Sequence, residues 1–149
     1  MSLDDLMIET VVSAPIDRLW TAWTSSERIK EWFAPEANID PRPGGYFELY
    51  FDPSDHGHMS TKGCVFTRIE PRSSLTFTWK GPDQFARLMN DPSRLTLVRV
   101  EFHEVSSLTR VIVNHSGWGE GEGWAEAREW HKNAWKDVLG KLKSVLESE

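Results

Sequence analysis

Residues 122–146 read EGWAEAREWHKNAWKDVLGKLKSVL, and this stretch decides the fold. Its apolar residues recur every three or four positions, which is the period of an α-helix with one buried face. The apolar stripe comprises Trp124, Ala127, His131, Ala134, Trp135, Val138, Leu142 and Val145. At 1.5 Å per residue such a helix is about 35 Å long, which is enough to cross a whole small domain.

Six segments before this helix alternate apolar and polar residues, which is the pattern of strands with one buried face. They span residues 6–12, 46–51, 63–70, 75–79, 95–105 and 108–115. Two short helices are predicted after the first strand, at residues 15–24 and 25–32. Ser25 and Ser26 are the candidate caps of the second helix.

Two connections have a distinctive composition. Residues 34–43 contain three prolines and are predicted to be irregular, and Gly44-Gly45 directly after them predicts a turn. Residues 81–94 form a longer polar connection with room for one helical turn.

The order of these elements predicts one α+β domain over residues 1–149. An antiparallel sheet with one apolar face must be covered, and the C-terminal helix is the only element long enough to cover it. A curved sheet wrapped around one helix leaves an internal cavity between the two. The short helices are placed to close one end of that cavity.

The composition excludes several classes of partner and location. A net charge of −6 without a Lys/Arg cluster argues against nucleic acid and against anionic membranes. No apolar run approaches the ~20 residues of a membrane span, and residues 1–5 lack the features of a signal peptide. Cys64 is the single cysteine, so no internal disulfide is expected and the cytoplasm is the predicted location.

Several short motifs follow one another in a fixed order along nearly the whole chain. They are Ala14-Pro15 with Leu19-Trp20, Thr24 with the segment ending at Trp32, RPGGYF at residues 42–47, Gly63 leading to Glu70-Pro71, LTFTW at 75–79, residues 109–113, HSGW at 115–118, and Trp135 with Leu139 and Leu142. In this order they resemble the helix-grip (SRPBCC) superfamily of START domains, polyketide cyclases and the birch-pollen allergen. Within it, the chain looks like the homologues of the activator of heat shock protein 90 ATPase.

The resemblance implies a curved antiparallel sheet gripping a long C-terminal helix. It also implies a cavity, in which members of the superfamily bind apolar ligands and some catalyse cyclisation or dehydration. Because one fold carries many activities, the choice among these functions must come from the residues of the site.

Aromatic residues are the strongest signal for such a site. Eight tryptophans exceed what a core of this size needs, and ligand pockets are mostly apolar with a few polar groups. The predicted ligand-binding residues are Trp32, Phe33, Phe47, Phe51, Phe66, Trp79, Trp118, Trp124, Arg128, His131 and Trp135. Trp20, Phe77 and Phe102 are assigned to the core.

His115 and His131 are the candidate catalytic residues. His115 follows the inward-facing set of the last strand and His131 lies on the inner stripe of the helix, so both are expected at the cavity. A buried imidazole can act as an acid, a base or an anchor for a ligand. The alternative is a hydrogen-bonded histidine at the cavity edge, and no nucleophile–histidine–carboxylate set is recognisable.

Other reactive side chains favour structural interpretations. Asp52, Asp55, His56 and His58 are possible metal ligands, but their spacing matches no established site and favours a solvated loop. Cys64 has no nearby base and is interpreted as a small inert side chain. No metal and no cofactor are therefore expected.

Three functions follow from this sequence, in order of preference. The first is non-catalytic binding of a small hydrophobic or aromatic ligand in the cavity. The second is a cyclase, dehydratase or hydrolase that uses a cavity histidine, and the third is a chaperone-regulating or protein-interaction module. Tyr46 and Tyr50 form a predicted exposed aromatic edge that would suit a homodimer.

Overall fold

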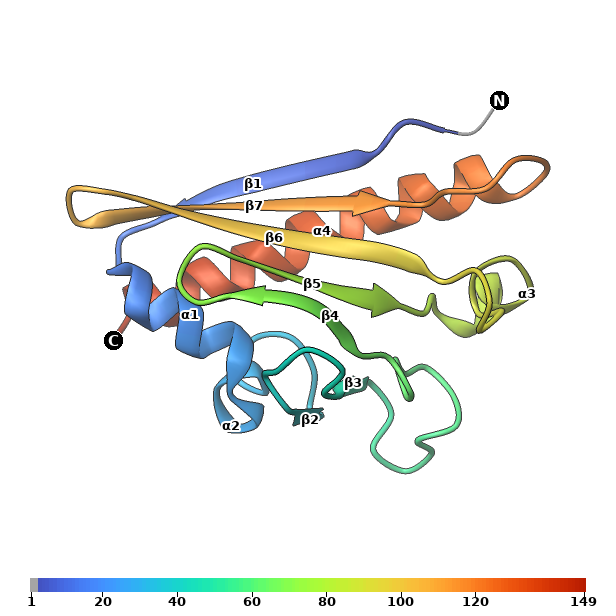
Figure 1. Ribbon diagram of the computed structural model, residues 1–149, viewed down its shortest axis with the longest axis horizontal. Helices are drawn as coiled ribbons and strands as arrows, with labels where there is room; N and C mark the ends of the chain where they lie inside the picture. Colours follow the sequence, from blue (N-terminus) through green and yellow to red (C-terminus); the bar gives the residue numbers. More distant parts are fainter. Residues whose placement is uncertain (1–2) are drawn as a thin grey trace.

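A computed structural model describes residues 3–149 of the chain (Figure 1). Residues 1 and 2 lie outside the described residues. The prediction that residues 1–5 lack signal-peptide features falls partly on them. The elements in order are β1 (Leu6–Val12), α1 (Ile16–Thr24), α2 (Ser26–Ile29), β2 (Glu36–Ile39), β3 (Phe47–Tyr50), β4 (Phe66–Glu70), β5 (Ser74–Trp79), the 3-10 turn η1 (Asp83–Phe85), α3 (Ala86–Met89), β6 (Thr96–Val105), β7 (Leu108–Ser116) and α4 (Trp124–Glu147).

Five strands form one antiparallel sheet in the order β1-β7-β6-β5-β4. The register places His115 of β7 between Leu6 of β1 and Val98 of β6, so these three side chains share the inner face. Helix α4 runs across the back of the sheet, and the short helices α1 and α2 lie at one end (Figure 1). The predicted α+β helix-grip fold is confirmed.

The buried face of α4 differs slightly from the predicted stripe. Ala127, His131, Trp135 and Leu142 are buried as expected, together with Leu139 and Leu146, while Val138 and Val145 are only partly buried. Both residues of each pair Val138/Leu139 and Val145/Leu146 are apolar, so periodicity alone did not fix the rotation of the helix. The packing against the sheet selects the leucines.

Residues 34–43 contain a strand that the sequence did not predict. Strand β2 pairs with β3 as a separate two-stranded sheet, in which Glu36 faces Tyr50 and Ile39 faces Phe47. Pro35 lies just before the strand, where its missing N–H does no harm to the ladder. The hydroxyl of Ser26 accepts a hydrogen bond from the N–H of Ile39 at 2.9 Å and ties β2 to α2.

The predicted turn at Gly44-Gly45 is confirmed and requires glycine. Gly44 has φ of +83°, in the left-handed region that favours glycine. A Cβ atom on Gly45 would lie 2.1 Å from the carbonyl oxygen of Asp40, closer than any side chain tolerates. The turn leads directly into β3.

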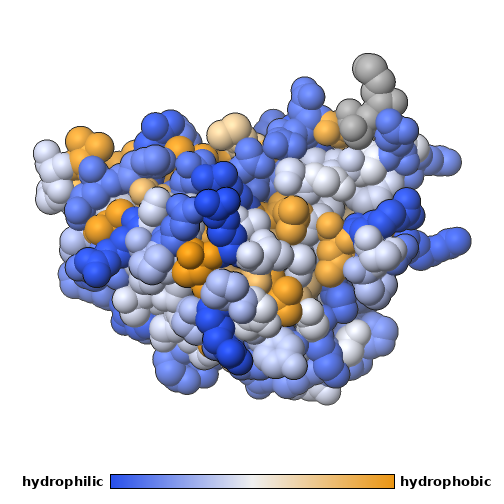
Figure 2. All heavy atoms as spheres, viewed as in Figure 1, coloured by the Kyte–Doolittle hydropathy of each residue, from blue (hydrophilic) through white to orange (hydrophobic). Residues whose placement is uncertain are grey.

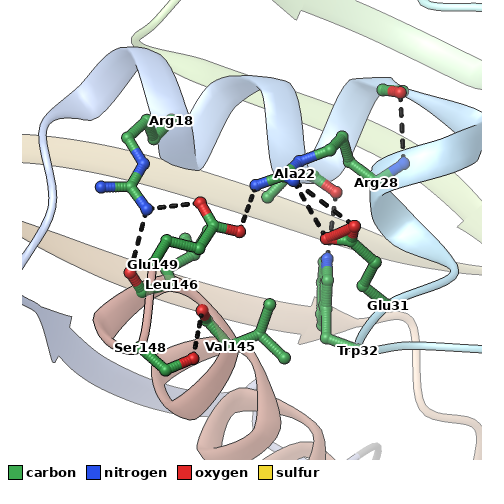
Figure 3. Close-up of polar contacts among 10 residues, drawn as sticks. Arg18, Ala22, Arg28, Glu31, Trp32, Val145, Leu146, Ser148 and Glu149 are labelled. Atoms are coloured by element: carbon green, nitrogen blue, oxygen red, sulfur yellow. Dashed lines mark hydrogen bonds and ion pairs between the residues drawn. The ribbon is translucent and has the colours of Figure 1, made fainter.

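The C-terminal end of α4 is fastened to the two short helices (Figure 3). The carboxylate of Glu149 lies between the guanidinium groups of Arg18 in α1 and Arg28 in α2 and pairs with both. Arg18 also donates to the carbonyl oxygen of Leu146 at 3.0 Å. These contacts hold the far end of the helix against α1 and α2.

The outer face of the sheet mixes polar and apolar side chains (Figure 2). Met7, Val11, Leu97 and Val105 are the exposed large hydrophobic residues of β1 and β6. The prediction that Tyr46 and Tyr50 form an exposed edge is correct for Tyr46, which is 51% exposed. It is wrong for Tyr50, which is only 8% exposed. None of the helices within residues 3–149 combines the length and the hydropathy that a membrane crossing requires.

Candidate functional site

A pocket of about 310 Å³ opens beside α4, between that helix, the end of β5 and the segment that follows β3. Aromatic and aliphatic side chains supply most of its wall. The lining residues are Phe33, Phe51, Met59, Ser60, Trp79, Lys80, Gly81, Pro82, Trp130, His131, Ala134, Trp135, Asp137 and Val138.

Helical spacing explains how α4 contributes to this wall. Trp130, Ala134 and Val138 follow one another at intervals of four residues and therefore lie on one side of the helix. His131 and Trp135 lie one position further toward the sheet and are almost fully buried. The small side chain of Ala134, between Trp130 and Val138, leaves room for the pocket.

The opposite wall is a segment after β3 that hydrogen bonds hold in place. The N–H of Phe51 donates to the carbonyl oxygen of Met59 at 3.0 Å, which closes the loop. Asp83 accepts from the N–H of Met59 at 3.1 Å, and its other oxygen lies 3.2 Å from Nδ1 of His58. Met59 and Phe51 are thereby fixed at the pocket rim.

Behind the pocket lies a buried group of five rings, here called the indole–imidazole cluster. It consists of Trp79, His115, Trp118, His131 and Trp135, all at most 6% exposed. The two imidazole rings are 5.3 Å apart between centroids and nearly perpendicular. Trp79 bridges them, with its ring 6.1 Å from His115 and 6.3 Å from His131.

His131 has both ring nitrogens occupied. Nε2 accepts a hydrogen bond from the indole N–H of Trp79 at 3.2 Å. Nδ1 lies 2.8 Å from the carbonyl oxygen of Ala127, which can only accept, so Nδ1 carries the proton. Burial lowers the pKa of His131 to about 4, against the smaller opposing effect of the Ala127 carbonyl.

His115 is satisfied in the complementary tautomer. Its Nδ1 accepts from the indole N–H of Trp135 at 3.1 Å, so the proton lies on Nε2, which is 2.9 Å from the hydroxyl of Thr96. Complete burial lowers the pKa of His115 well below its usual value, and the neighbouring His131 lowers it further. The carbonyl oxygen of His115 accepts from the indole of Trp118 at 2.9 Å.

The cluster has a clear chemical consequence. A general base needs a free lone pair directed at its substrate, and in each histidine that lone pair already accepts an indole N–H. Both imidazoles are neutral near pH 7 because burial lowers the pKa of each. The arrangement satisfies buried polar groups and fixes the positions of Trp79 and Trp135 at the pocket wall.

The structure brings five of the predicted ligand-binding residues to the pocket. They are Phe33, Phe51, Trp79, His131 and Trp135. Phe51 is the most exposed of them, since 36% of its surface is accessible, and it lies on the rim.

Several other predicted residues lie within the core. Phe47 stacks on Phe77 with 3.6 Å between ring centroids, and Phe66 meets Phe47 edge-on at 5.4 Å. Trp32 packs against Trp23 at 4.7 Å and donates its indole N–H to the carbonyl oxygen of Ala22. These rings are not part of the pocket lining, because the pocket opens beside α4 and not along the sheet centre.

The remaining predicted residues lie around the start of α4. Trp124 is partly buried against Gly119, where an added Cβ would come within 2.5 Å of the indole. Arg128 donates to the carbonyl oxygens of Asp4 and Asp5, at 2.9 and 3.1 Å. Arg128 therefore holds the segment before β1 and does not line the pocket, in contrast to its predicted position at the cavity.

Nine lining residues were not predicted from the sequence. They are Met59, Ser60, Lys80, Gly81, Pro82, Trp130, Ala134, Asp137 and Val138. Trp130 offered a signal, because a tryptophan outside the apolar stripe of an amphipathic helix suggests a second contact surface. Ala134 and Val138 were assigned to the stripe but not to the pocket.

The possible metal ligands after β3 do not converge. His56 pairs with Glu36 and His58 with Asp83, while Asp52 and Asp55 accept hydrogen bonds from their own turns. Within residues 3–149 no three histidine, cysteine or carboxylate side chains are placed to share a metal ion. Cys64 is fully buried, and burial raises the pKa of its thiol to about 11.

The fold is shared with solved structures of low sequence identity. A protein from Mesorhizobium loti is 22% identical with a TM-score of 0.78, and the match covers 97% of this chain and 98% of that chain. The Aha1 dimer from Colwellia psychrerythraea is 18% identical with a TM-score of 0.74, over 97% of each chain. DynU16, from the dynemicin biosynthetic locus, is 22% identical with a TM-score of 0.72, over 97% of this chain but 48% of its own.

No curated protein matches the sequence significantly. A family model matches residues 13–147, which is nearly the whole chain, and describes the Activator of Hsp90 ATPase homolog 1-like proteins. The resemblance seen in the motifs and the helix-grip architecture agree with this match. The chain belongs to the family of Activator of Hsp90 ATPase homolog 1-like proteins.

Proposed function

We propose that this protein binds a small hydrophobic or aromatic molecule in the pocket beside α4, without catalysing its conversion. The observation that carries the proposal is a pocket of about 310 Å³ walled by five phenylalanine and tryptophan side chains. Ligand pockets typically measure about 300–1,000 Å³ and are mostly apolar. This pocket lies at the lower end of that range and suits a compact ligand.

The exposed aromatic rim supports the same proposal. Trp130 and Phe51 are 39% and 36% exposed, although both belong to the most apolar side-chain types. Exposed aromatic side chains around a hollow are typical of binding sites, because ligand burial removes their surface from water.

The indole–imidazole cluster favours binding over catalysis by a histidine. An enzyme that used His131 as a base would first have to break its hydrogen bond with Trp79. His115 lies behind Trp135 and donates to Thr96, away from the pocket lining. The cyclase, dehydratase or hydrolase alternative therefore lacks a free catalytic group among these residues.

Filling the pocket from α4 tests the proposal. Ala134→Phe places a ring in the pocket, and Ala125→Phe places the same ring on an exposed position of the same helix. A panel of apolar and aromatic compounds is titrated while tryptophan fluorescence is followed, and native mass spectrometry checks for a co-purified ligand.

We expect Ala134→Phe to weaken binding at least about tenfold, because the added ring occupies ligand volume. Ala125→Phe is expected to bind like the unmodified protein. Equal binding by both variants, or no binding of any compound by the unmodified protein, would contradict the proposal.

A second candidate, regulation of a chaperone ATPase, rests on the family match and on the Colwellia Aha1 neighbour. It predicts that the purified chain changes the ATP hydrolysis rate of a cognate Hsp90. Because the Colwellia neighbour is a dimer, self-association is measured in the same samples by sedimentation. An unchanged hydrolysis rate at saturating chain concentration would remove this candidate.

A further inference from the structure

The polar groups deep in the pocket are used within the protein. Trp79 and Trp135 donate their indole N–H groups to the two buried histidines. Ser60 donates its hydroxyl to the carbonyl oxygen of His56 at 2.8 Å. The inner end of the pocket therefore offers a ligand aromatic surface and no free hydrogen-bond donor from these side chains.

The mouth is different, because it has an unpaired charge. Asp137 lies on α4 two turns after Trp130 and lines the pocket. Within the described residues its carboxylate has no hydrogen bond and no ion pair. It is exposed, so an incoming ligand can reach it.

Aromatic side chains line the same pocket as this carboxylate. Phe33 is tilted by 31° from Trp79 at 6.0 Å and stands at 74° to Trp135 at 5.5 Å. Phe51 adds a ring 6.4 Å from Phe33, and Trp130 closes the side of α4. The faces of aromatic rings carry negative potential and attract cations, so the exposed rings of Phe51 and Trp130 favour a cationic group at the mouth.

Lys80 is the one group in the lining that opposes a cation. Its ammonium donates to the carbonyl oxygen of Lys62 at 2.6 Å, which holds it toward the segment before β4. The net charge of −6 acts in the opposite sense and attracts cations to the surface as a whole. The local carboxylate, the aromatic faces and the overall charge thus favour the same sign of ligand.

We propose that the ligand is a hydrophobic cation, with an apolar body against Phe33, Trp79 and Trp135 and an amine or quaternary ammonium group at the mouth beside Asp137 and Trp130. This inference rests on the proposed function, because it names the class of ligand that the same pocket takes.

Three probes with one apolar body and different charges test the inference. They are 4-tert-butylbenzylammonium, 4-tert-butylbenzyl alcohol and 4-tert-butylbenzoate. Their dissociation constants are measured at neutral pH and low ionic strength, because salt screens charges that are exposed to solvent. We expect the ammonium compound to bind about three to ten times more tightly than the alcohol, and the carboxylate most weakly.

Two variants test whether the preference for a cation comes from the charged residues of the pocket lining. Asp137→Asn is expected to weaken binding of the ammonium compound about threefold to fivefold and to leave the alcohol unchanged. Lys80→Met is expected to strengthen binding of the ammonium compound and to weaken binding of the carboxylate. Glu129→Gln is the matched control, because it removes one negative charge from an exposed position of α4 outside the pocket lining.

The outcomes separate this inference from the proposed function. If the alcohol or the carboxylate binds best, or if Asp137→Asn behaves like Glu129→Gln, the ligand is not a cation although the pocket still binds apolar molecules. If none of the three probes binds, or if Ala134→Phe leaves binding of the alcohol intact, the proposed function fails as well.

Discussion

The two halves of α4 lie in different surroundings although one apolar stripe runs through both. In the C-terminal half, Leu139, Leu142 and Leu146 are at most 2% exposed, and Arg18 binds the end of the helix (Figure 3). In the part before it, Trp130 is 39% exposed, and residues from Trp130 to Val138 line a pocket of about 310 Å³ beside the helix. The same periodic pattern thus produces closed packing at one end and an accessible space at the other.

The largest predicted effect concerns packing in the closed half. Leu142→Ala is expected to lower the free energy of unfolding by about 2–4 kcal/mol, because it removes a fully buried side chain and leaves a cavity. Val138→Ala, at the pocket and only partly buried, is expected to lower it by less than about 1 kcal/mol. Urea unfolding measures both values.

That experiment also tests the predicted single domain over residues 1–149, which should unfold in one cooperative transition. Equal losses in the two variants would show that the pocket half is packed as tightly as the closed half.

The second prediction concerns pH and the indole–imidazole cluster. In the unfolded chain His115 and His131 regain ordinary pKa values near 6.5, whereas the folded pKa is about 4 for His131 and also lowered for His115. Between these values the unfolded state binds more protons, so the free energy of unfolding decreases as pH falls from about 7 to about 5. Each histidine contributes at most about 1.4 kcal/mol per pH unit.

Urea unfolding at several pH values measures this slope. His131→Gln should make the slope shallower, because it removes a group whose folded pKa is lowered by burial. Most carboxylates titrate below this range, so a slope unaffected by His131→Gln would indicate that His131 can be protonated in the folded protein.

A third prediction compares two tryptophans of α4. Trp135→Phe removes the N–H that His115 accepts and leaves a buried nitrogen unpaired, so we expect a loss of about 1–3 kcal/mol. Trp130→Phe changes an exposed ring on the rim and should alter stability by less than about 0.5 kcal/mol. Thermal unfolding of the two variants provides the comparison, and a larger loss for Trp130→Phe would reverse the roles assigned to the two rings.

The smallest expected effect is at the C-terminal anchor. Glu149→Gln removes the charge shared by Arg18 and Arg28, but exposed ion pairs contribute little and are screened by salt. The midpoint of urea unfolding should shift far less than in Leu142→Ala, and the shift should disappear at high salt. A shift as large as that of Leu142→Ala would make the anchor, and not the leucines, the main support of the closed half.

The sequence predicted the elements whose signals are long and periodic. The α4 stripe and the alternation in β1, β5, β6 and β7 indicated the helix-grip fold correctly. Strand β2 was missed because Pro35 and Pro41 flank it closely and its four residues are too few for a clear alternation. The pattern could not predict which of Val138 and Leu139 is buried more deeply, because both residues are apolar.

The site was less predictable because a cavity depends on where packing stops. Phe33, Trp79, His131 and Trp135 lie on the pocket wall, while their contact with a ligand stays a prediction. Phe47 and Phe66 carry the same alternation signal yet lie in the core, since the pocket opens to one side of the sheet. The sequence did not indicate Asp137 as a pocket residue, because a charged residue on a helix usually faces water.

The most direct test of the central claim observes the tryptophan indole N–H groups one by one by ¹H–¹⁵N NMR during titration with an apolar or aromatic ligand. Binding in the pocket should shift the signals of the lining tryptophans Trp130, Trp79 and Trp135 saturably and together. Trp23 and Trp32, which pack on each other near the closed end, should stay unchanged. Shifts confined to Trp23 and Trp32, or no shifts with any ligand, would contradict an open binding site beside α4.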